Sequence, residues 1–217
     1  MNKITRVILK DNELNLNLTE GSSFINLLNR KKEEGYSKHD IENLKSSTIE
    51  ILQNCIPSQV SSRNIKSNTG IVIGKIQSGK TMSFTSLMAL ARDNKFKIAI
   101  IISGRTKLLL GQTVRRLKDE LQKEDSQISV NKDCYESDSF LTTIKKRLER
   151  NRKNNKLYII PVLKHQDHID KIIKCFKSID LRESLNANGI IIIDDEADQA
   201  SLNTKEKKNA ANNGDDE

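Results

Sequence analysis

Residues 74–81 combine glycines, a lysine and a threonine at a spacing that suits the binding of a triphosphate. They read Gly-Lys-Ile-Gln-Ser-Gly-Lys-Thr and fit the pattern GxxxxGK[ST] at every fixed position. Glycines let the backbone approach an anion closely, and the N–H groups at the start of a helix point at phosphate oxygens. The residues expected to bind ATP are Gly74, Gln77, Ser78, Gly79, Lys80 and Thr81.

Lys80 and Thr81 have separate expected roles in such a loop. Lys80 reaches the β- and γ-phosphates, and the hydroxyl of Thr81 binds a magnesium ion. The apolar residues 71–73 precede the loop and a helical pattern follows it, which is the strand–loop–helix context that the motif requires. The alternative is a Gly/Ser turn that fits the pattern by chance, and this context disfavours it.

A second group of candidate residues follows an apolar run near the end of the sequence. Residues 190–193 are all isoleucine, and Asp194, Asp195, Glu196 and Asp198 come directly after them. Ligands of open α/β sheets bind at the carboxyl ends of strands, and clustered carboxylates there need a facing positive charge. We expect Asp195 to contact magnesium and Glu196 to orient or deprotonate the attacking water. The alternative is an acidic first turn of a helix.

Strand-like and helix-like segments alternate through residues 69–204 and must position these side chains. Near-continuous apolar runs at 97–102, 157–162 and 190–193 predict strands that are buried on both faces. Helices are expected at residues 81–92, 108–121, 139–153 and 167–185. A polar interval at 125–133 separates the second and third of these helices. The alternation predicts an α/β fold with a mostly parallel sheet and helices on both faces.

Residues 1–68 are expected to form a separate, mainly helical leader. One amphipathic helix is predicted at 22–31, and a second begins at the N-cap Ser37 and ends before Pro57. The apolar positions expected to pack in a core are Phe24, Leu27, Leu28, Ile41, Leu44, Ile49 and Leu52. Residues 205–217 contain no apolar side chain larger than alanine and are expected to form a disordered tail.

Composition narrows the class of protein. The 217 residues are 35% hydrophobic and 30% charged, which is typical of a heavily solvated protein. No apolar run approaches the ~20 residues of a membrane span, and the first residues do not resemble a signal peptide, so we expect a cytoplasmic location. The net charge of +8 is compatible with a polyanionic partner, although richness in lysine alone produces the same balance.

The glycine loop and the acidic segment together carry a family resemblance. The loop ending in Lys80 and Thr81, with Asp-Glu-Ala-Asp at 195–198, resembles the first RecA-like lobe of superfamily 2 DEAD/DEAH-box helicases. Within that class, the residues of the two motifs are most similar to those of bacterial helicase-like proteins that are often described as endonucleases. The resemblance covers about residues 70–203 and implies a P-loop NTPase fold.

The resemblance also implies a nucleic-acid contact. Residues 103–113 are similar to the segment that follows a strand in these helicases and touches the nucleic-acid backbone, which implies contacts from Arg105, Thr106 and Thr113, with DNA as the expected partner. A basic loop at a helix N-terminus suits phosphates and reads no base sequence. The alternative is a solvated loop with an ordinary helix cap, and the sequence leaves both open. Lys164, past the strand at 157–162, is a further candidate for a phosphate contact.

In this helicase class ATP is hydrolysed between two lobes, and arginines from the second lobe stabilise the transition state. The sequence shows one lobe and no nuclease motif, so we expect the ATP-binding lobe of a nucleic-acid-dependent ATPase that is weak or inactive by itself. A missing C-terminal region or a partner protein would supply the second lobe. Two alternatives are a nucleotide-binding regulatory module without turnover and a P-loop kinase-type phosphotransferase.

Overall fold

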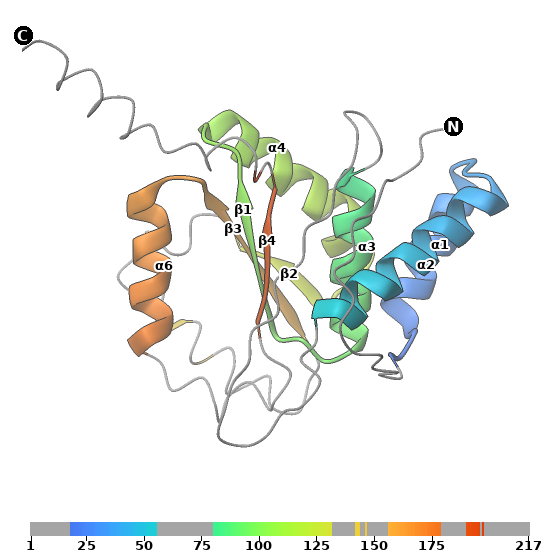
Figure 1. Cartoon of the computed structure of the whole chain (residues 1–217), viewed down its shortest axis with the longest axis horizontal. Coiled ribbons are helices and arrows are strands. Elements are labelled where there is room, and N and C mark those ends of the chain that lie inside the picture. Colours follow the sequence, from blue (N-terminus) through green and yellow to red (C-terminus); the bar gives the residue numbers. More distant parts are fainter. Residues whose placement is uncertain are drawn as a thin grey trace, which may run out of the picture.

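The computed structural model describes residues 18–55, 80–131, 142–143, 146, 156–178, 190–195 and 197. Its helices and strands are shown in Figure 1. In chain order they are α1 (Ser22–Glu33), α2 (Lys38–Cys55), α3 (Lys80–Asp93), β1 (Ile98–Ser103), α4 (Lys107–Leu117), η1 (Lys118–Gln122), β2 (Ile128–Val130), β3 (Leu157–Leu163), α6 (Gln166–Ser178) and β4 (Ile190–Asp194).

The described strands form one parallel sheet in the order β2-β3-β1-β4. β1 lies between β3 and β4, so that Ile98 pairs with Tyr158 on one side and with Ile190 on the other. β1 and β3 are almost wholly buried, as expected of parallel strands covered on both faces. The α/β class and the three strands expected from the apolar runs are confirmed.

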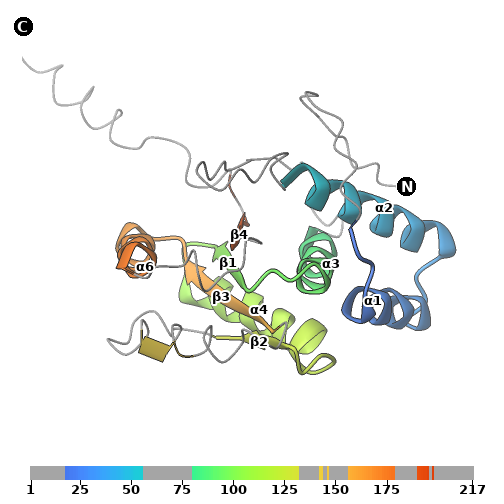
Figure 2. The same cartoon turned by 90° about the horizontal axis from the view of Figure 1, so that it is seen from below.

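Helices cover the two faces of the sheet unequally. α3 and α4 share a hydrophobic core with one face, to which β1 contributes Ala99 and Ile101. The other face carries Ile100 and Ile160, both buried, and α6 packs against β3 there (Figure 2). Successive residues of a strand point to opposite faces, so we call these the α3 face and the α6 face.

α1 and α2 pack on α3, on its side away from the sheet (Figures 1 and 2). Phe24 of α1 and Leu52 of α2 are fully buried in the core cluster that α3 shares with the sheet. Both helices expected in this part of the chain are confirmed, and the backbone N–H of Asp40 donates to the Oγ of the N-cap Ser37 at 3.1 Å. The division expected near residue 68 lies outside the described residues.

The end of α3 holds the start of α1. The carboxylate of Asp93, 1% exposed, accepts hydrogen bonds from the backbone N–H groups of Phe24 at 2.9 Å and Ser23 at 3.3 Å. Gly21 permits this approach, because a Cβ there would lie 2.7 Å from Asp93 Cγ. A carboxylate at a helix N-terminus satisfies free N–H groups and complements the helix dipole. One side chain of α3 therefore fixes where α1 begins.

The sequence interpretation missed β2. The interval 125–133 was described only as polar, between two expected helices, but Ile128–Val130 pair with β3 and bury Ile128 and Val130. Three residues are too short for a periodic signal to stand out. The Oε1 of Gln122 accepts a hydrogen bond from Val130 N–H at 2.8 Å, a contact that comes from η1 and that no apolar pattern reveals.

The remaining expected segments are only partly described. The helix expected at 108–121 is observed as α4 followed by the π-helical turn η1, and that at 167–185 as α6 up to Ser178. Most of 139–153 and all of 205–217 lie outside the described residues. Within the described part of the chain, no helix combines the length and apolar character needed to cross a bilayer.

Candidate functional site

The first residues of α3 lie at the edge of the sheet where the strands end. α3 has 14 residues, about 21 Å of helix, and β1 begins only a few residues after the helix ends. α3 therefore runs antiparallel to β1 and returns its N-terminus to the carboxyl ends of the strands (Figure 1). A helix N-terminus at this edge presents backbone N–H groups where ligands of α/β sheets bind.

The structure describes only part of the residue set expected from the sequence. Lys80 and Thr81 are the first two residues of α3, and their backbone is described but their side chains are not. Asp195 is described. The expected residues that lie outside the described part of the chain are Gly74, Gln77, Ser78, Gly79 and Glu196. What the structure brings to one edge is thus the start of α3 and the end of β4.

β4 ends in a carboxylate at Asp194, and Asp195 is the next residue along the chain. Ile191 is buried in the core on the α3 face and Ile193 packs against it. Alternation along β4 assigns Asp194 to the α6 face. The backbone N–H of Asp195, the residue after the strand, donates to Ile102 O at 2.9 Å and so holds Asp195 beside the end of β1.

This donor arrangement fits a magnesium ion that is shared with a ligand. Magnesium is usually held by one or two carboxylates, waters and substrate phosphates rather than by a cage of protein groups. Asp195 supplies one carboxylate at the edge of the sheet where α3 begins with Lys80 and Thr81. Among the residues that the structure describes, no cluster of three or more His, Cys, Asp or Glu is present.

Lys164 forms an ion pair at the same edge that the sequence did not predict. It directly follows β3, and its Nζ lies 2.9 Å from Oδ1 of Asp194, the last residue of β4. The Lys164 side chain is only 8% exposed, and its backbone N–H donates to Ser103 O at 3.1 Å. The sequence suggested a phosphate contact for Lys164, whereas the structure gives its ammonium a carboxylate partner. Knowledge of the strand order was needed to find this pair.

The loop after β1 shows how the expected nucleic-acid contacts are placed. Arg105 is exposed, whereas Thr113 is buried within α4 at 8% exposure. Thr106 is the N-cap of α4, and its Oγ1 accepts a hydrogen bond from Leu109 N–H at 3.3 Å. This cap is what the first interpretation predicts, in which the loop is solvated and an ordinary helix begins after it. The exposed arginine beside the cap suits the second interpretation, a phosphate contact. Both interpretations of the loop stay open.

Thr106→Ala is expected to lower the free energy of unfolding by about 1 kcal/mol, because the side-chain acceptor for an end N–H of α4 is lost. Thr106→Ser, which keeps the hydroxyl, should stay within about 0.5 kcal/mol of the wild type. Urea denaturation followed by circular dichroism measures both. Equal stability of the alanine and serine variants would show that the cap contributes nothing.

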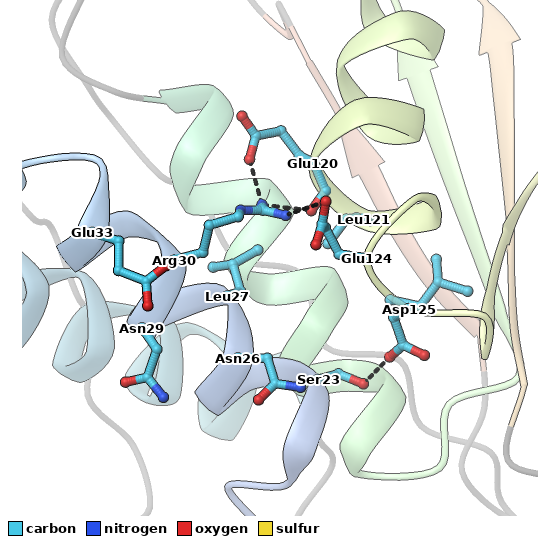
Figure 3. Close-up of a pocket in the computed structure, with 11 residues that line it drawn as sticks. Ser23, Asn26, Leu27, Asn29, Arg30, Glu33, Glu120, Leu121, Glu124 and Asp125 are labelled. Carbon is cyan, nitrogen blue, oxygen red and sulfur yellow. Dashed lines mark hydrogen bonds and ion pairs between the residues drawn. The ribbon is translucent and has the colours of Figure 1, made fainter.

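A groove of about 470 Å³ lies elsewhere, between α1 and η1 (Figure 3). Across it Nη2 of Arg30 lies 2.7 Å from Oε2 of Glu120, and Lys31 Nζ lies 2.7 Å from the same carboxylate and from Glu34. Burial lowers the pKa of Lys31, but its hydrogen bonds to Glu120 and Glu34 outweigh this and raise the pKa above its ordinary value. These charges already neutralise one another and hold α1 against η1.

The carboxyl edge of the sheet is therefore the better candidate site, because it joins a helix N-terminus, a strand-end carboxylate and the last two residues of the glycine motif, Lys80 and Thr81. Comparison of the chain with family models, with curated proteins and with solved structures gave no match.

Proposed function

We propose that this chain is the ATP-binding lobe of a nucleic-acid-dependent, helicase-like ATPase with a P-loop (RecA-like) fold. One observation carries the proposal: the start of α3 and the end of β4, followed directly by Asp195, lie at one edge of the sheet. This is the arrangement that residues 74–81 require if they are to hold a triphosphate beside a carboxylate.

Each candidate residue then has a defined task. Backbone N–H groups at the start of α3 bind the phosphates, and Lys80 offsets their negative charge. Thr81 and Asp195 would hold magnesium, which when bound neutralises charge on the phosphates. Glu196, the next residue after Asp195, orients a water molecule or accepts its proton.

Turnover by this lobe alone should be slow. Charge on the transferred phosphoryl group is commonly stabilised by arginines brought from outside the phosphate-binding loop, and removing such a group costs orders of magnitude in rate. A second ATPase lobe, in a C-terminal region or in a partner, would supply them. The exposed Arg105 and the N-terminus of α4, at the same edge of the sheet, would contact DNA phosphates without reading bases.

The test measures binding and turnover of the purified chain separately. Titration with a fluorescent ATP analogue is expected to show saturable binding that requires magnesium. Hydrolysis of ATP should be slow and should rise when single-stranded or duplex DNA is added, with RNA as the comparison. Absence of nucleotide binding would overturn the proposal. Binding without turnover under every condition would instead identify a regulatory module.

A further inference from the structure

Positive side chains follow one flank of α4 along its whole length. At roughly 100° per residue, a sector of about 80° contains Lys107, Gly111, Arg115 and the first residue after the helix, Lys118. The buried residues of α4 lie outside this sector. The three cations are exposed, and none of them forms an ion pair within the part of the chain that the structure describes. We call these four residues the basic flank.

α4 lacks the acidic residues that offset lysines elsewhere in the protein. The helix, Lys107–Leu117, contains no Asp or Glu, and the nearest acid that follows, Asp119, already pairs with Lys123 at 2.7 Å. In α6, by contrast, Asp167 comes four residues before Lys171, a spacing that places opposite charges side by side. The basic flank therefore keeps a positive potential that no side chain of its own helix cancels, and such a stripe attracts a polyanion.

Three features of the basic flank are unfavourable for a helix without a ligand. Lys107 places a positive charge at the positive end of the helix dipole, and Arg115 and Lys118 are like charges at neighbouring positions. Gly111 lies in mid-helix, where glycine is less stable than alanine, although a Cβ there would meet no atom within 4 Å. Packing thus does not require this glycine. A bound anion would relieve the unfavourable charges, and the bare backbone at Gly111 would let it approach closely.

We propose that the basic flank of α4 binds the phosphodiester backbone of a DNA strand, which runs along the helix from Lys107 to Lys118. The inference rests on the proposed function for the identity of the polyanion, and it extends the contact well beyond Arg105. Eleven residue steps cover about 16 Å, which is several phosphates of a strand with a charge every 3.4 Å or so. Contacts of this kind position a strand and read no base sequence.

The test measures the affinity for a fluorescein-labelled oligothymidine strand by anisotropy, without nucleotide and over a series of salt concentrations. Replacing Lys107, Arg115 and Lys118 together by Gln is expected to weaken binding by about tenfold or more at low salt. The slope of log affinity against log salt should become shallower by about 2, because each lost contact to a single strand removes about 0.7. A labelled strand of mixed sequence should give the same result.

α6 supplies the matched control on the other face of the sheet. Replacing Lys171, Lys174 and Lys177, all exposed, by Gln removes the same charge from the whole protein. This variant should keep its DNA affinity within about twofold of the wild type and its salt slope unchanged, because charges outside the contact are screened. Circular dichroism checks the fold of both triple variants. If the α4 variant fails to fold, the single variant Lys118→Gln takes its place, with a slope shallower by about 0.7.

Gly111→Gln separates binding from folding. Glutamine is the better helix former, so the midpoint of urea denaturation should rise. Its longer side chain covers the flank, so DNA affinity should fall by about three- to tenfold, although no charge has changed. Stability and affinity that move in opposite directions rule out unfolding as the cause. Unchanged DNA affinity would overturn the close approach of the strand to Gly111.

The outcomes separate this inference from the proposed function. If the triple variants of α4 and α6 bind DNA equally, with the same salt slope, the basic flank is not the binding surface, even if the wild type binds ATP. A wild type that binds ATP but no DNA also overturns the inference. A wild type that binds no ATP overturns the proposed function, whereas a loss of DNA binding confined to the flank variants would still support the inference.

Discussion

Lys80→Ala is expected to weaken the binding of Mg–ATP by about 10- to 100-fold, because a charged hydrogen-bond donor to phosphate contributes about 1.5–3 kcal/mol. The residue is the first of α3, at the carboxyl edge of the sheet, and in the proposed function its ammonium would contact a triphosphate held by the preceding loop. Hydrolysis should fall at least as much, since the lysine also faces charge that develops on the transferred group. Titration with a fluorescent ATP analogue measures the first effect and phosphate release the second.

The chain supplies a matched control for this variant in Lys38. It is likewise the first residue of a helix, α2, and its side chain is 88% exposed. Lys38→Ala removes the same charge from the whole protein but lies outside the candidate site, so ATP affinity should stay within about twofold of the wild type. Equal losses in the two variants would mean that net charge, not the glycine loop, governs binding. Unchanged binding in Lys80→Ala would remove the basis of the proposed function.

Asp93→Ala is expected to lower the free energy of unfolding by about 2–4 kcal/mol, the largest effect on stability that we anticipate from a single polar residue here. The buried carboxylate accepts from Phe24 N–H at 2.9 Å and also lies 2.9 Å from Nη1 of Arg92. Its removal leaves helix N–H groups without their acceptor, and the partly buried guanidinium of Arg92 keeps only the more distant Asp125, 3.9 Å from its Nε, as an ion-pair partner. Asp93→Asn keeps one acceptor oxygen but no charge and should cost less, about 1–2 kcal/mol.

Asp119 offers the comparison for Asp93. It pairs with Lys123 one helical turn away, at 2.7 Å, but both side chains are largely in solvent, at 47% and 70% exposure. Asp119→Ala should therefore cost no more than about 0.5 kcal/mol. Urea denaturation of the three variants tests the ranking, and hydrogen exchange at Ser23 and Phe24 reports whether the start of α1 has come loose. If Asp93→Ala costs no more than Asp119→Ala, the contacts between α3 and α1 add nothing to stability.

Local patterns were sufficient to predict the elements that build the candidate site. The near-continuous apolar runs became β1, β3 and β4, because strands covered on both faces must be apolar along their length. The helical spacing after the glycine loop became α3, which ends at Asp93, one residue past the expected end of the helix. Each of these features depends on residues a few positions apart and can therefore be predicted from a single sequence.

Short and side-chain-dependent features were not predictable in this way. β2 has three residues, and an amide from η1 completes its hydrogen bonding. The same limit applies to the loop after β1, where Thr106 fits both a helix cap and a phosphate contact. A threonine before a helix carries the same local signal in either case, because both uses need the hydroxyl at the same position.

The sequence by itself determined an α/β chain with a complete glycine loop and a strand that ends in carboxylates. Only the tertiary structure decided the strand order β2-β3-β1-β4, which seats Lys164 against Asp194, 30 residues away, and brings Asp93 to Phe24 across 69 residues. The physical reason is that apolar strands resemble one another, so their composition does not encode which of them are neighbours. The pairing of strands is determined when the helices and strands pack together, and the ion pairs at the sheet edge form only in that arrangement.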